Sequence, residues 1–252
     1  MSQIPSVCII VPCFNEASRL PVEDFKEFLQ GNQNKSICLF FVDDGSTDST
    51  LNVLNDLHSS FLSQTTIINL LHNKGKAEAV RVGINTALAD NRRFEWIGYF
   101  DADLATPLSA INDLYSAVNQ ANYRFVLGSR VLILGHRIER VWYRHYFGRI
   151  FATFASILLK LPVYDTQCGA KLIHRSICKS LFDEPFISAW FFDVELLARV
   201  IKYYGRDFVA KHLLEYPLYE WVEKHESKIK ISDVIKIPLE FLKIYKHYKS
   251  SL

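Results

Sequence analysis

The sequence predicts an α/β fold in which a mostly parallel sheet carries helices on both faces. Short apolar runs alternate with amphipathic stretches along the first half of the chain, the order that repeated β–α units produce. Two of these apolar runs end in paired acids, Asp43 with Asp44 and Asp101 with Asp103. Parallel strands bring their carboxyl ends to one edge of the sheet, where such folds bind ligands, so we expect both acidic pairs at one site.

The elements of the first half follow this alternation in order. Apolar runs predict strands at residues 7–11, 37–42, 65–70, 96–100 and 124–127. Helical periodicity predicts helices at residues 21–30, around 51–57, at 75–88 and at 108–118. Pro21 suits a first helical turn, and Ser46, Thr47 and Asp48 can cap the second helix. These elements supply the sheet and its two helical layers.

The composition changes after residue 130. Residues 131–161 are basic, aromatic and aliphatic with one acid, Glu139. Apolar residues recur there at helical spacing: Tyr143, Phe147, Phe151, Phe154 and Leu158. Arg137, Arg140 and Arg144 recur at intervals of three and four, which predicts that they share one helical face. Such a helix fits either a membrane surface or a core position with a solvated basic end, and both interpretations stay open.

The remaining residues predict a strand at 169–174, a helix within 187–204 and a strand-like stretch at 207–216. The tail, residues 228–252, alternates apolar residues with lysines and predicts a basic amphipathic helix interrupted near Pro238. No repeat or low-complexity linker divides the chain. We therefore predict one domain over residues 1–225 and a basic amphipathic extension over residues 226–252.

Composition and charge exclude several classes of protein. The net charge of +2 is too small to indicate a nucleic-acid partner. Five cysteines without a C-x-x-C pair argue against a disulfide framework or a zinc site and for a reducing, cytoplasmic setting. The first residues do not resemble a signal peptide, and no apolar run reaches the ~18 residues of a membrane span. We expect a chain that does not cross a membrane by itself but is able to lie on its cytoplasmic face.

Asp101 and Asp103 follow a strand that is apolar and aromatic throughout. Two carboxylates one residue apart suit hard cations such as Mg²⁺ or Mn²⁺, whose other ligands are commonly phosphate oxygens. For Asp43 and Asp44 the alternative is a simple turn followed by a helix cap. The chain has no P-loop, no G-x-G-x-x-G after its first strand and no G-x-S-x-G nucleophile elbow. After these exclusions, a metal–phosphate site on a parallel sheet is the interpretation that remains.

Five short motifs follow one another along the chain: residues 11–16 (VPCFNE), 42–48 (VDDGSTD), 73–76 (NKGK), 101–103 (DAD) and 128–130 (GSR). Their order and spacing resemble those of the family 2 glycosyltransferases. The chain resembles this family over roughly residues 5–225, and residues 165–172 and 221–228 look most like the dolichyl-phosphate β-glucosyltransferases. Polyprenyl-phosphate mannosyl- and glucosyltransferases are similar too. The resemblance implies a GT-A fold, a nucleotide-diphospho-sugar donor and inversion at the anomeric carbon.

The resemblance also implies where the base and ribose of the donor would bind. Pro12, Phe14 and Glu16 would frame them. Asp44 would hydrogen-bond the base, with Asp43 beside it. The donor is therefore expected to start at the ends of the first two strands.

The diphosphate end of the donor is expected at a second group of motif residues. By resemblance, Lys76 would lie near the donor. Asp101, Ala102 and Asp103 would contact the ribose, the metal ion and the diphosphate, with Asp101 and Asp103 as the metal ligands. Arg130 and Lys171 would face phosphate groups.

The expected chemistry follows from charge. Breaking the sugar–phosphate bond leaves an increasingly negative diphosphate and an oxocarbenium-like sugar, so a divalent cation, Arg130 and Lys171 would stabilise the leaving group. A saccharide hydroxyl acceptor would need a general base. Asp193 and Asp165 are the candidate bases, and the alternative for each is a structural helix cap.

A lipid-phosphate acceptor would need no base, because its oxygen is already anionic. Cations would hold it instead, and Arg137, Arg140 and Arg144 are the candidates. Residues 131–161 and 228–249 would provide a peripheral membrane contact. Ala77 and Ala170 depart from the family pattern, which usually has glycine and an aromatic residue there, so glucose and mannose both stay open.

Three functions are consistent with these residues. The first is a peripheral enzyme that moves a hexose, glucose from UDP-glucose in the main hypothesis, to a polyprenyl or dolichyl phosphate. The second is a soluble family 2 glycosyltransferase with a saccharide acceptor in surface-glycan synthesis. The third is a non-catalytic nucleotide-sugar binding protein on the same fold, against which the intact Asp101 and Asp103 argue.

Overall fold

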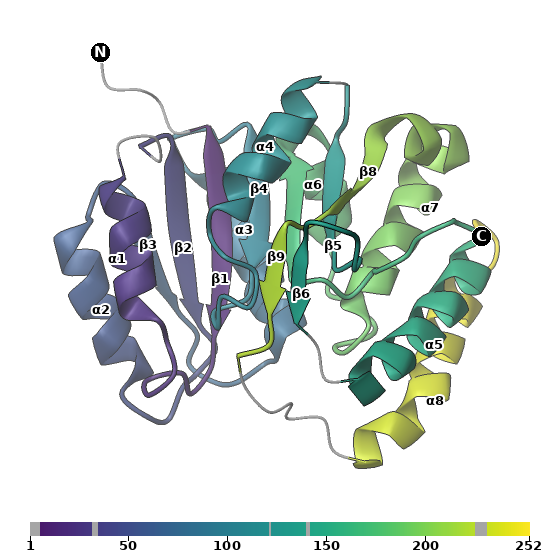
Figure 1. Ribbon diagram of the computed structural model, residues 1–252, viewed down its shortest axis with the longest axis horizontal. Helices are drawn as coiled ribbons and strands as arrows, with labels where there is room; N and C mark the ends of the chain where they lie inside the picture. The colour runs from purple at the N-terminus through teal and green to yellow at the C-terminus, as the bar shows by residue number, and fades with distance from the viewer. Residues whose placement is uncertain (1–5, 32–34, 121, 140–141, 225–230) are drawn as a thin grey trace.

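The computed structural model describes residues 6–31, 35–120, 122–139, 142–224 and 231–252, with the side chains of 119–120, 142–147 and 231–237 left out of the description. Seven strands form the main sheet in the order β3-β2-β1-β4-β7-β5-β8. They are β1 (Val7–Cys13), β2 (Ile37–Asp43), β3 (Thr65–Asn69), β4 (Trp96–Phe100), β5 (Phe125–Ser129), β7 (Ala170–His174) and β8 (Leu213–Pro217). All neighbours are parallel except β7, which is antiparallel to β4 and β5 (Figure 1).

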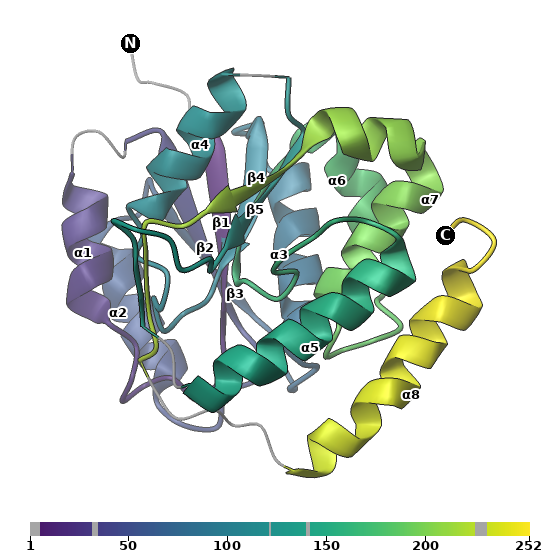
Figure 2. The same ribbon diagram turned by 45° about the vertical axis from the view of Figure 1, so that its right-hand side comes forward.

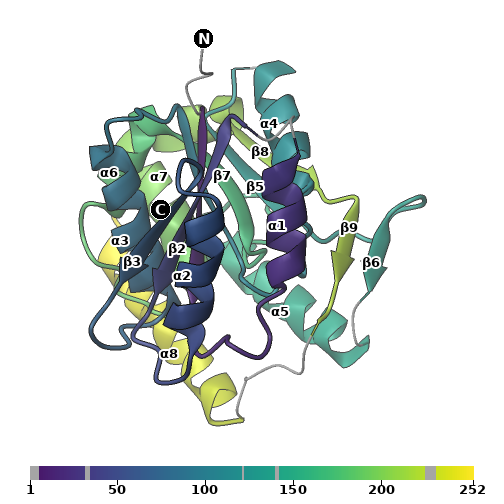
Figure 3. The same ribbon diagram turned by 90° about the vertical axis from the view of Figure 1, so that its left-hand side faces the viewer.

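Helices cover both faces of this sheet, as predicted. One face carries α1 (Val22–Gln30), α2 (Thr50–Ser60) and α4 (Ala110–Gln120). The other carries α3 (Lys76–Ala89), α5 (Trp142–Leu159), α6 (Arg175–Phe182), α7 (Phe192–His212) and α8 (Ile231–Tyr248). Figure 3 shows α1 and α4 on one side of the strands and α3 and α6 on the other.

Strand side chains alternate between these two layers. In β1, Cys8 and Ile10 belong to the core beneath α3, whereas Ile9 and Val11 belong to the core beneath α1. Successive side chains of a strand point to opposite faces, and here both faces are covered. This is why the strand sequences are apolar throughout and show no polar alternation.

The sheet brings the two acidic strand ends together. β1 lies between β2 and β4 and is parallel to both. Asp43 is the last residue of β2, and Asp101 directly follows β4. Both therefore emerge at the same edge of the sheet, which confirms the prediction from the sequence.

The predicted helical face of three arginines is wrong for Arg137. This residue lies in β6 (Arg137–Glu139), a short strand that pairs with β9 (Glu220–Val222) in a separate two-stranded sheet. Arg140 lies outside the described residues, and Arg144 lies in α5, with its side chain not described. The pairing of β6 with a distant segment overrides the local periodicity that suggested one continuous helix.

Two further predictions about the second half need correction. Residues 207–212 continue α7, and only residues 213–216 of the predicted strand lie in β8. The break expected at the end of the helix is real, because Gly205 has a non-helical φ of 81°, but a second helical segment follows it. Pro238 does not interrupt α8, which runs continuously from Ile231 to Tyr248.

Candidate active site

Asp44 ties the end of β2 to the start of α3. Its side chain is buried, and its two carboxylate oxygens accept the backbone N–H groups of Lys74 and Gly75, each at 2.8 Å. Burial raises the pKa of Asp44 above its ordinary value, although the two backbone bonds oppose this. Neighbouring Asp43 accepts bonds from the backbone and hydroxyl of Ser46. The acidic pair is thus fixed within its loop.

The residues expected to frame a base and ribose lie beside this pair. Pro12 of β1 is the register partner of Val42, and Phe14 and Glu16 follow β1 directly. All three are partly exposed, and the Glu16 carboxylate pairs with Arg19 at 2.6 Å. The structure therefore places these three residues next to the acidic end of β2, and their contact with a base and ribose stays a prediction.

Backbone-to-side-chain bonds join the two loops. The N–H of Asn15 donates to the Ser46 hydroxyl at 3.0 Å, and the Thr47 N–H donates back to the Asn15 side-chain oxygen at 2.9 Å. The N–H of Glu16 donates to the Thr50 hydroxyl at 2.8 Å. These bonds give the two loops a defined relative position.

Lys76, the first residue of α3, connects this region to the acids after β4. Its Nζ lies 2.5 Å from Oδ1 of Asp101. Burial lowers the pKa of Lys76, but the carboxylates of Asp101, Asp193 and Asp103 outweigh burial and raise the pKa overall. The lysine therefore stays protonated and holds a positive charge among three carboxylates.

Gly169 creates the space that the Asp101 carboxylate occupies. A Cβ atom at this glycine would lie 2.0 Å from Oδ2 of Asp101, a distance that no side chain tolerates. Ala102 is buried, and Oδ1 of Asp103 accepts the N–H of Ala105 at 3.0 Å. Gly169 belongs to the sequence motif DTQCGAKL, but the motif alone did not show that the glycine makes room for the Asp101 carboxylate.

Arg130 and Asp165 form a two-pronged ion pair at the neighbouring strand end. Arg130 follows β5, and its Nε and Nη2 donate to the two carboxylate oxygens of Asp165 at 2.6 and 2.7 Å. Burial lowers the pKa of Arg130, but Asp165 outweighs it and raises the pKa. The guanidinium also lies 5.3 Å from the Trp221 ring centroid. With both oxygens engaged, Asp165 is better placed to position Arg130 than to accept a proton.

A second carboxylate, which the sequence analysis missed, fixes the loop before β7. Oε2 of Glu215 accepts the Tyr164 N–H at 2.8 Å, and Oε1 accepts the Asp165 N–H at 2.6 Å. Glu215 lies in β8, far along the chain from this loop. Only the strand order brings it here, so no local sequence pattern signals it.

Lys171 and Asp193 form a buried pair beneath the site. Lys171 is fully buried, and its Nζ donates to Oδ1 of Asp193 and to the Cys168 carbonyl, both at 2.6 Å. Tyr99, its register partner across β4 and β7, donates its hydroxyl to the same Asp193 oxygen. Burial and the Asp193 charge raise the pKa of Tyr99. The structure therefore does not expose Lys171 to a phosphate group, contrary to the expectation from resemblance.

The oxygen ligands of Asp101 and Asp103 suit Mg²⁺ or Mn²⁺. Among the described residues no group of three or more His, Cys, Asp or Glu side chains could hold a metal ion. The residues present thus fit a cation that takes its remaining ligands from water and phosphate oxygens, which is common for Mg²⁺. They do not fit a cation held by protein groups alone.

The three arginines expected to hold an acceptor phosphate do not form one visible cluster. Arg137 is exposed and pairs with Glu139 at 2.7 Å and with Glu220 at 3.1 Å. Arg140 and the side chain of Arg144 lie outside the described part of the chain. Their role in holding the acceptor stays a prediction.

This sheet order, with the acidic ends of β2 and β4 on one edge, defines the GT-A fold of glycosyltransferases. Two solved structures of glucosyl-3-phosphoglycerate synthase from Mycobacterium tuberculosis share it. The complex with UDP has a TM-score of 0.64 at 16% identity and covers 95% of this chain and 79% of that one. The complex with Mn²⁺, UDP and phosphoglyceric acid has a TM-score of 0.68 at 14% identity, covering 95% and 76%.

The family itself follows from sequence. The model for glycosyl transferase family 2 matches residues 8–182, and the chain belongs to this family. A dolichyl-phosphate beta-glucosyltransferase of Trichomonas vaginalis is 30% identical over 98% of this chain and 75% of its own length. The Mus musculus dolichyl-phosphate beta-glucosyltransferase is 30% identical over 90% of this chain and 71% of its own length.

Proposed function

We propose that this protein transfers glucose from UDP-glucose to dolichyl phosphate or a similar polyprenyl phosphate, with inversion at the anomeric carbon. The observation that carries the proposal is the continuous link from Asp44 through Lys74 and Gly75 to Lys76 and Asp101. It joins the expected base-binding end of the site to its diphosphate end. The 30% identity to dolichyl-phosphate beta-glucosyltransferases supports the choice of sugar and acceptor.

Each group at the edge of the sheet has a task in this proposal. Asp44 accepts hydrogen bonds from the base, and Asp101 and Asp103 hold Mg²⁺ or Mn²⁺ with the diphosphate. The metal ion, when bound, neutralises the charge that develops on the leaving diphosphate. Lys76 and Arg130 add fixed positive charge at the same end, and their raised pKa values keep both protonated.

The state of the two candidate bases favours a phosphate acceptor over a hydroxyl acceptor. Asp165 is held by Arg130 through both oxygens, and Asp193 is buried against Lys171 and Tyr99. Neither carboxylate is poised to remove a proton from a sugar hydroxyl, which a saccharide acceptor requires. A phosphate oxygen attacks as an anion, so the proposed reaction needs no such base.

The test is a screen of donors and acceptors read by product mass. We expect glucosyl-phospholipid from UDP-glucose, dolichyl phosphate and Mg²⁺ or Mn²⁺, and loss of product with a chelator. Asp103→Asn should lower kcat by about 100-fold, because an orienting and charge-carrying oxygen is lost. Asp56→Asn, an exposed acid on α2, is the matched control. Product from saccharides alone, or full activity of Asp103→Asn with chelator present, would overturn the proposal.

We also propose that α5 and α8 bring the protein to the membrane surface where such an acceptor resides. The two helices lie side by side (Figure 2). Each exposes apolar side chains at helical spacing, Ile150, Phe154 and Ile157 on α5 and Leu239, Leu242 and Tyr245 on α8. Among the described residues no helix is long and apolar enough to cross a membrane.

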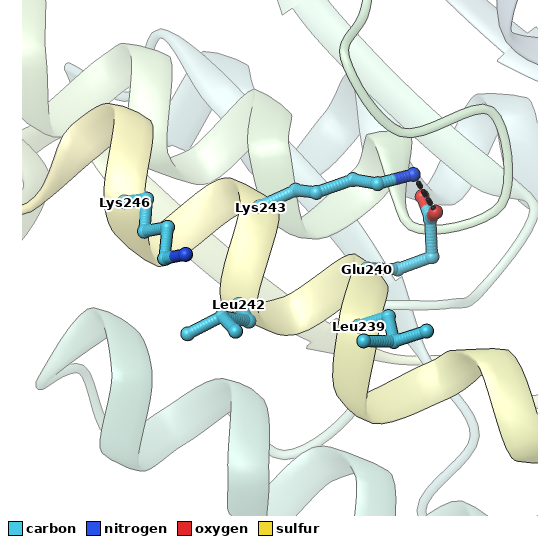
Figure 4. Close-up of a pocket in the computed structure, with 5 residues that line it drawn as sticks. All are labelled: Leu239, Glu240, Leu242, Lys243 and Lys246. Carbon is cyan, nitrogen blue, oxygen red and sulfur yellow. Dashed lines mark hydrogen bonds and ion pairs between the residues drawn. The ribbon is translucent and has the colours of Figure 1, made fainter.

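Lysines accompany the apolar side chains on α8. A shallow groove of about 330 Å³ is lined by Leu239, Glu240, Leu242, Lys243 and Lys246 (Figure 4). Lys243 pairs with Glu240 at 2.6 Å. Apolar side chains beside lysines are typical of helices that lie in the interface of anionic bilayers.

Vesicle flotation tests the membrane contact separately from catalysis. We expect binding to vesicles with anionic lipid and weaker binding at high salt. The double variant Phe154→Glu with Leu242→Glu should lose most of this binding. Leu62→Glu, a change at an exposed leucine after α2 and away from both helices, should retain it. Equal binding by both variants would exclude the α5–α8 surface.

A further inference from the structure

Three buried side-chain atoms among the described residues meet no hydrogen-bond partner: Ser129 Oγ, Arg149 Nη1 and Gln167 Nε2. Buried polar groups are nearly always paired, so each such atom needs an explanation. Ser129 directly precedes Arg130, and Gln167 lies two residues after Asp165. Arg149 reaches the same loop from α5. The unpaired atoms thus belong to or contact the segments that carry the Arg130–Asp165 pair.

Arg149 is the most unusual of the three because it carries a full charge. Its guanidinium carbon lies 3.8 Å from the centroid of the Tyr164 ring, a cation–π contact. No carboxylate of the described residues forms an ion pair with it. Arg130, which meets the next residue of the same loop, is in contrast paired with Asp165 through two hydrogen bonds. Of the two guanidinium groups that meet this loop, only that of Arg130 is engaged in an ion pair among the described residues.

The position of Arg149 is fixed by its surroundings. Tyr164 beneath it is held through its backbone N–H by Glu215, whose other oxygen holds the adjacent Asp165. Glu215 is engaged by these two amides. A guanidinium kept partly out of water with a buried N–H group that has no hydrogen-bond partner costs free energy, which an anionic ligand recovers on binding. Its planar donors match the oxygens of a phosphate group.

We propose that Arg149 binds the phosphate group of the acceptor. The inference rests on the proposed function only in naming that phosphate as the acceptor's. It adds a further arginine to those that the sequence singled out, and Arg149 follows Arg144 by five residues on α5. The recognised chemistry is a phosphate monoester, which a lipid headgroup and a soluble phosphate share.

Direct binding measurements test this without turnover. The dissociation constants of UDP, farnesyl phosphate, farnesol and inorganic phosphate are compared for the full chain and its variants. We expect Arg149→Gln to weaken the binding of farnesyl phosphate about tenfold or more, which is the usual effect of losing a charged hydrogen bond. The affinity for UDP should be unchanged. Arg149→Lys should restore part of the affinity. A parallel loss for inorganic phosphate would support direct contact with the phosphate group.

Arg93→Gln is the matched control. Arg93 is exposed and precedes β4, at the edge of the sheet opposite to the site. The Arg93→Gln variant removes the same charge and should leave all four dissociation constants unchanged. Unchanged farnesyl phosphate affinity in Arg149→Gln, or an equal loss for farnesol or UDP, would overturn the inference. If the wild-type protein binds farnesyl phosphate through Arg149 but makes no glucolipid, the proposed reaction fails while this site stands.

Discussion

Gly169 sets the position of Asp101 by lacking a side chain. The Asp101 carboxylate lies where a Cβ atom of residue 169 would be, and it forms an ion pair with Lys76. A carboxylate that binds a metal ion with a diphosphate must keep its place to within a fraction of an ångström. Residue 169 must therefore be a glycine because the Asp101 carboxylate comes so close to its backbone. Its φ angle is ordinary and does not require a glycine.

Gly169→Ala is expected to lower kcat by about 100-fold or more, because the added methyl group displaces Asp101. The measurement is glucosyl transfer alongside thermal unfolding, and Tm should change far less than activity. Gly148→Ala on α5 is the control, since a Cβ atom there would meet nothing within 4 Å. Equal activity in the two variants would contradict this prediction, because it would show that Asp101 tolerates a side chain at residue 169.

Single residues also show where sequence reasoning reached its limit. The acids after β2 and β4 were predictable, because charge at the end of an apolar strand is conspicuous. The partners of Lys171 were not, since its pairing with Tyr99 comes from antiparallel register and its contact with Asp193 from the packing of α7. Glu215 was missed for the same reason. Residues joined only by tertiary structure leave no local pattern.

At the scale of elements, helix α6 begins with an unusual cap. The N-cap residue is His174, whose Nδ1 accepts the Ser176 N–H at 3.2 Å. Burial lowers the pKa of His174, as does the charge of Arg124, while Glu95 opposes them. The cap requires a neutral ring, because a protonated imidazole has no acceptor nitrogen.

This cap predicts a pH-dependent stability. With its pKa lowered in the folded state, His174 takes up a proton more readily in the unfolded chain, so stability is full above the unfolded pKa of ~6.5 and falls as pH drops through it. His174→Asn keeps an acceptor at the cap but does not titrate. We expect the free energy of unfolding to fall less between pH 7.5 and 5.5 in this variant. An identical fall in both proteins would contradict the role of His174, and exposed His72→Asn controls for loss of an imidazole.

The long elements were predictable and the short ones were not. Strands covered on both faces give unbroken apolar runs, so β1, β2 and β4 were found close to their true limits. The three-residue strands β6 and β9 exist only because they pair with each other, and α6 occupies just eight residues. Segments this short carry too few residues to show a period.

At the scale of the whole molecule, α8 belongs to the main core. Ile244 is fully buried, and the Tyr248 hydroxyl donates to Oε1 of Glu195 on α7 at 3.0 Å. Arg199 lies in the same buried cluster and pairs with Glu195 at 2.8 Å. A segment that appeared in the sequence as a basic extension thus contributes to the packing of α7, whose first turn carries Asp193.

Two substitutions on α8 test this contribution to stability. Ile244→Ala should lower the free energy of unfolding by about 2–5 kcal/mol, the range for removing a buried aliphatic side chain. Leu242→Ala, on the exposed side of the same helix, should change it by about 0.5 kcal/mol or less. Denaturant unfolding measures both. Small effects from both substitutions would indicate that residues 226–252 are an independent appendage.

The link between Asp44 and Lys76 has a consequence for the length of donor that the site can bind. Asp44 holds the amides of Lys74 and Gly75, and the very next residue holds Asp101. The two ends of the site are therefore separated by a short, fixed piece of backbone rather than by two independent loops. If the proposed binding mode holds, this fixed spacing selects donors by length, because a nucleotide sugar with one phosphate too few would reach Asp44 or Asp101 but not both.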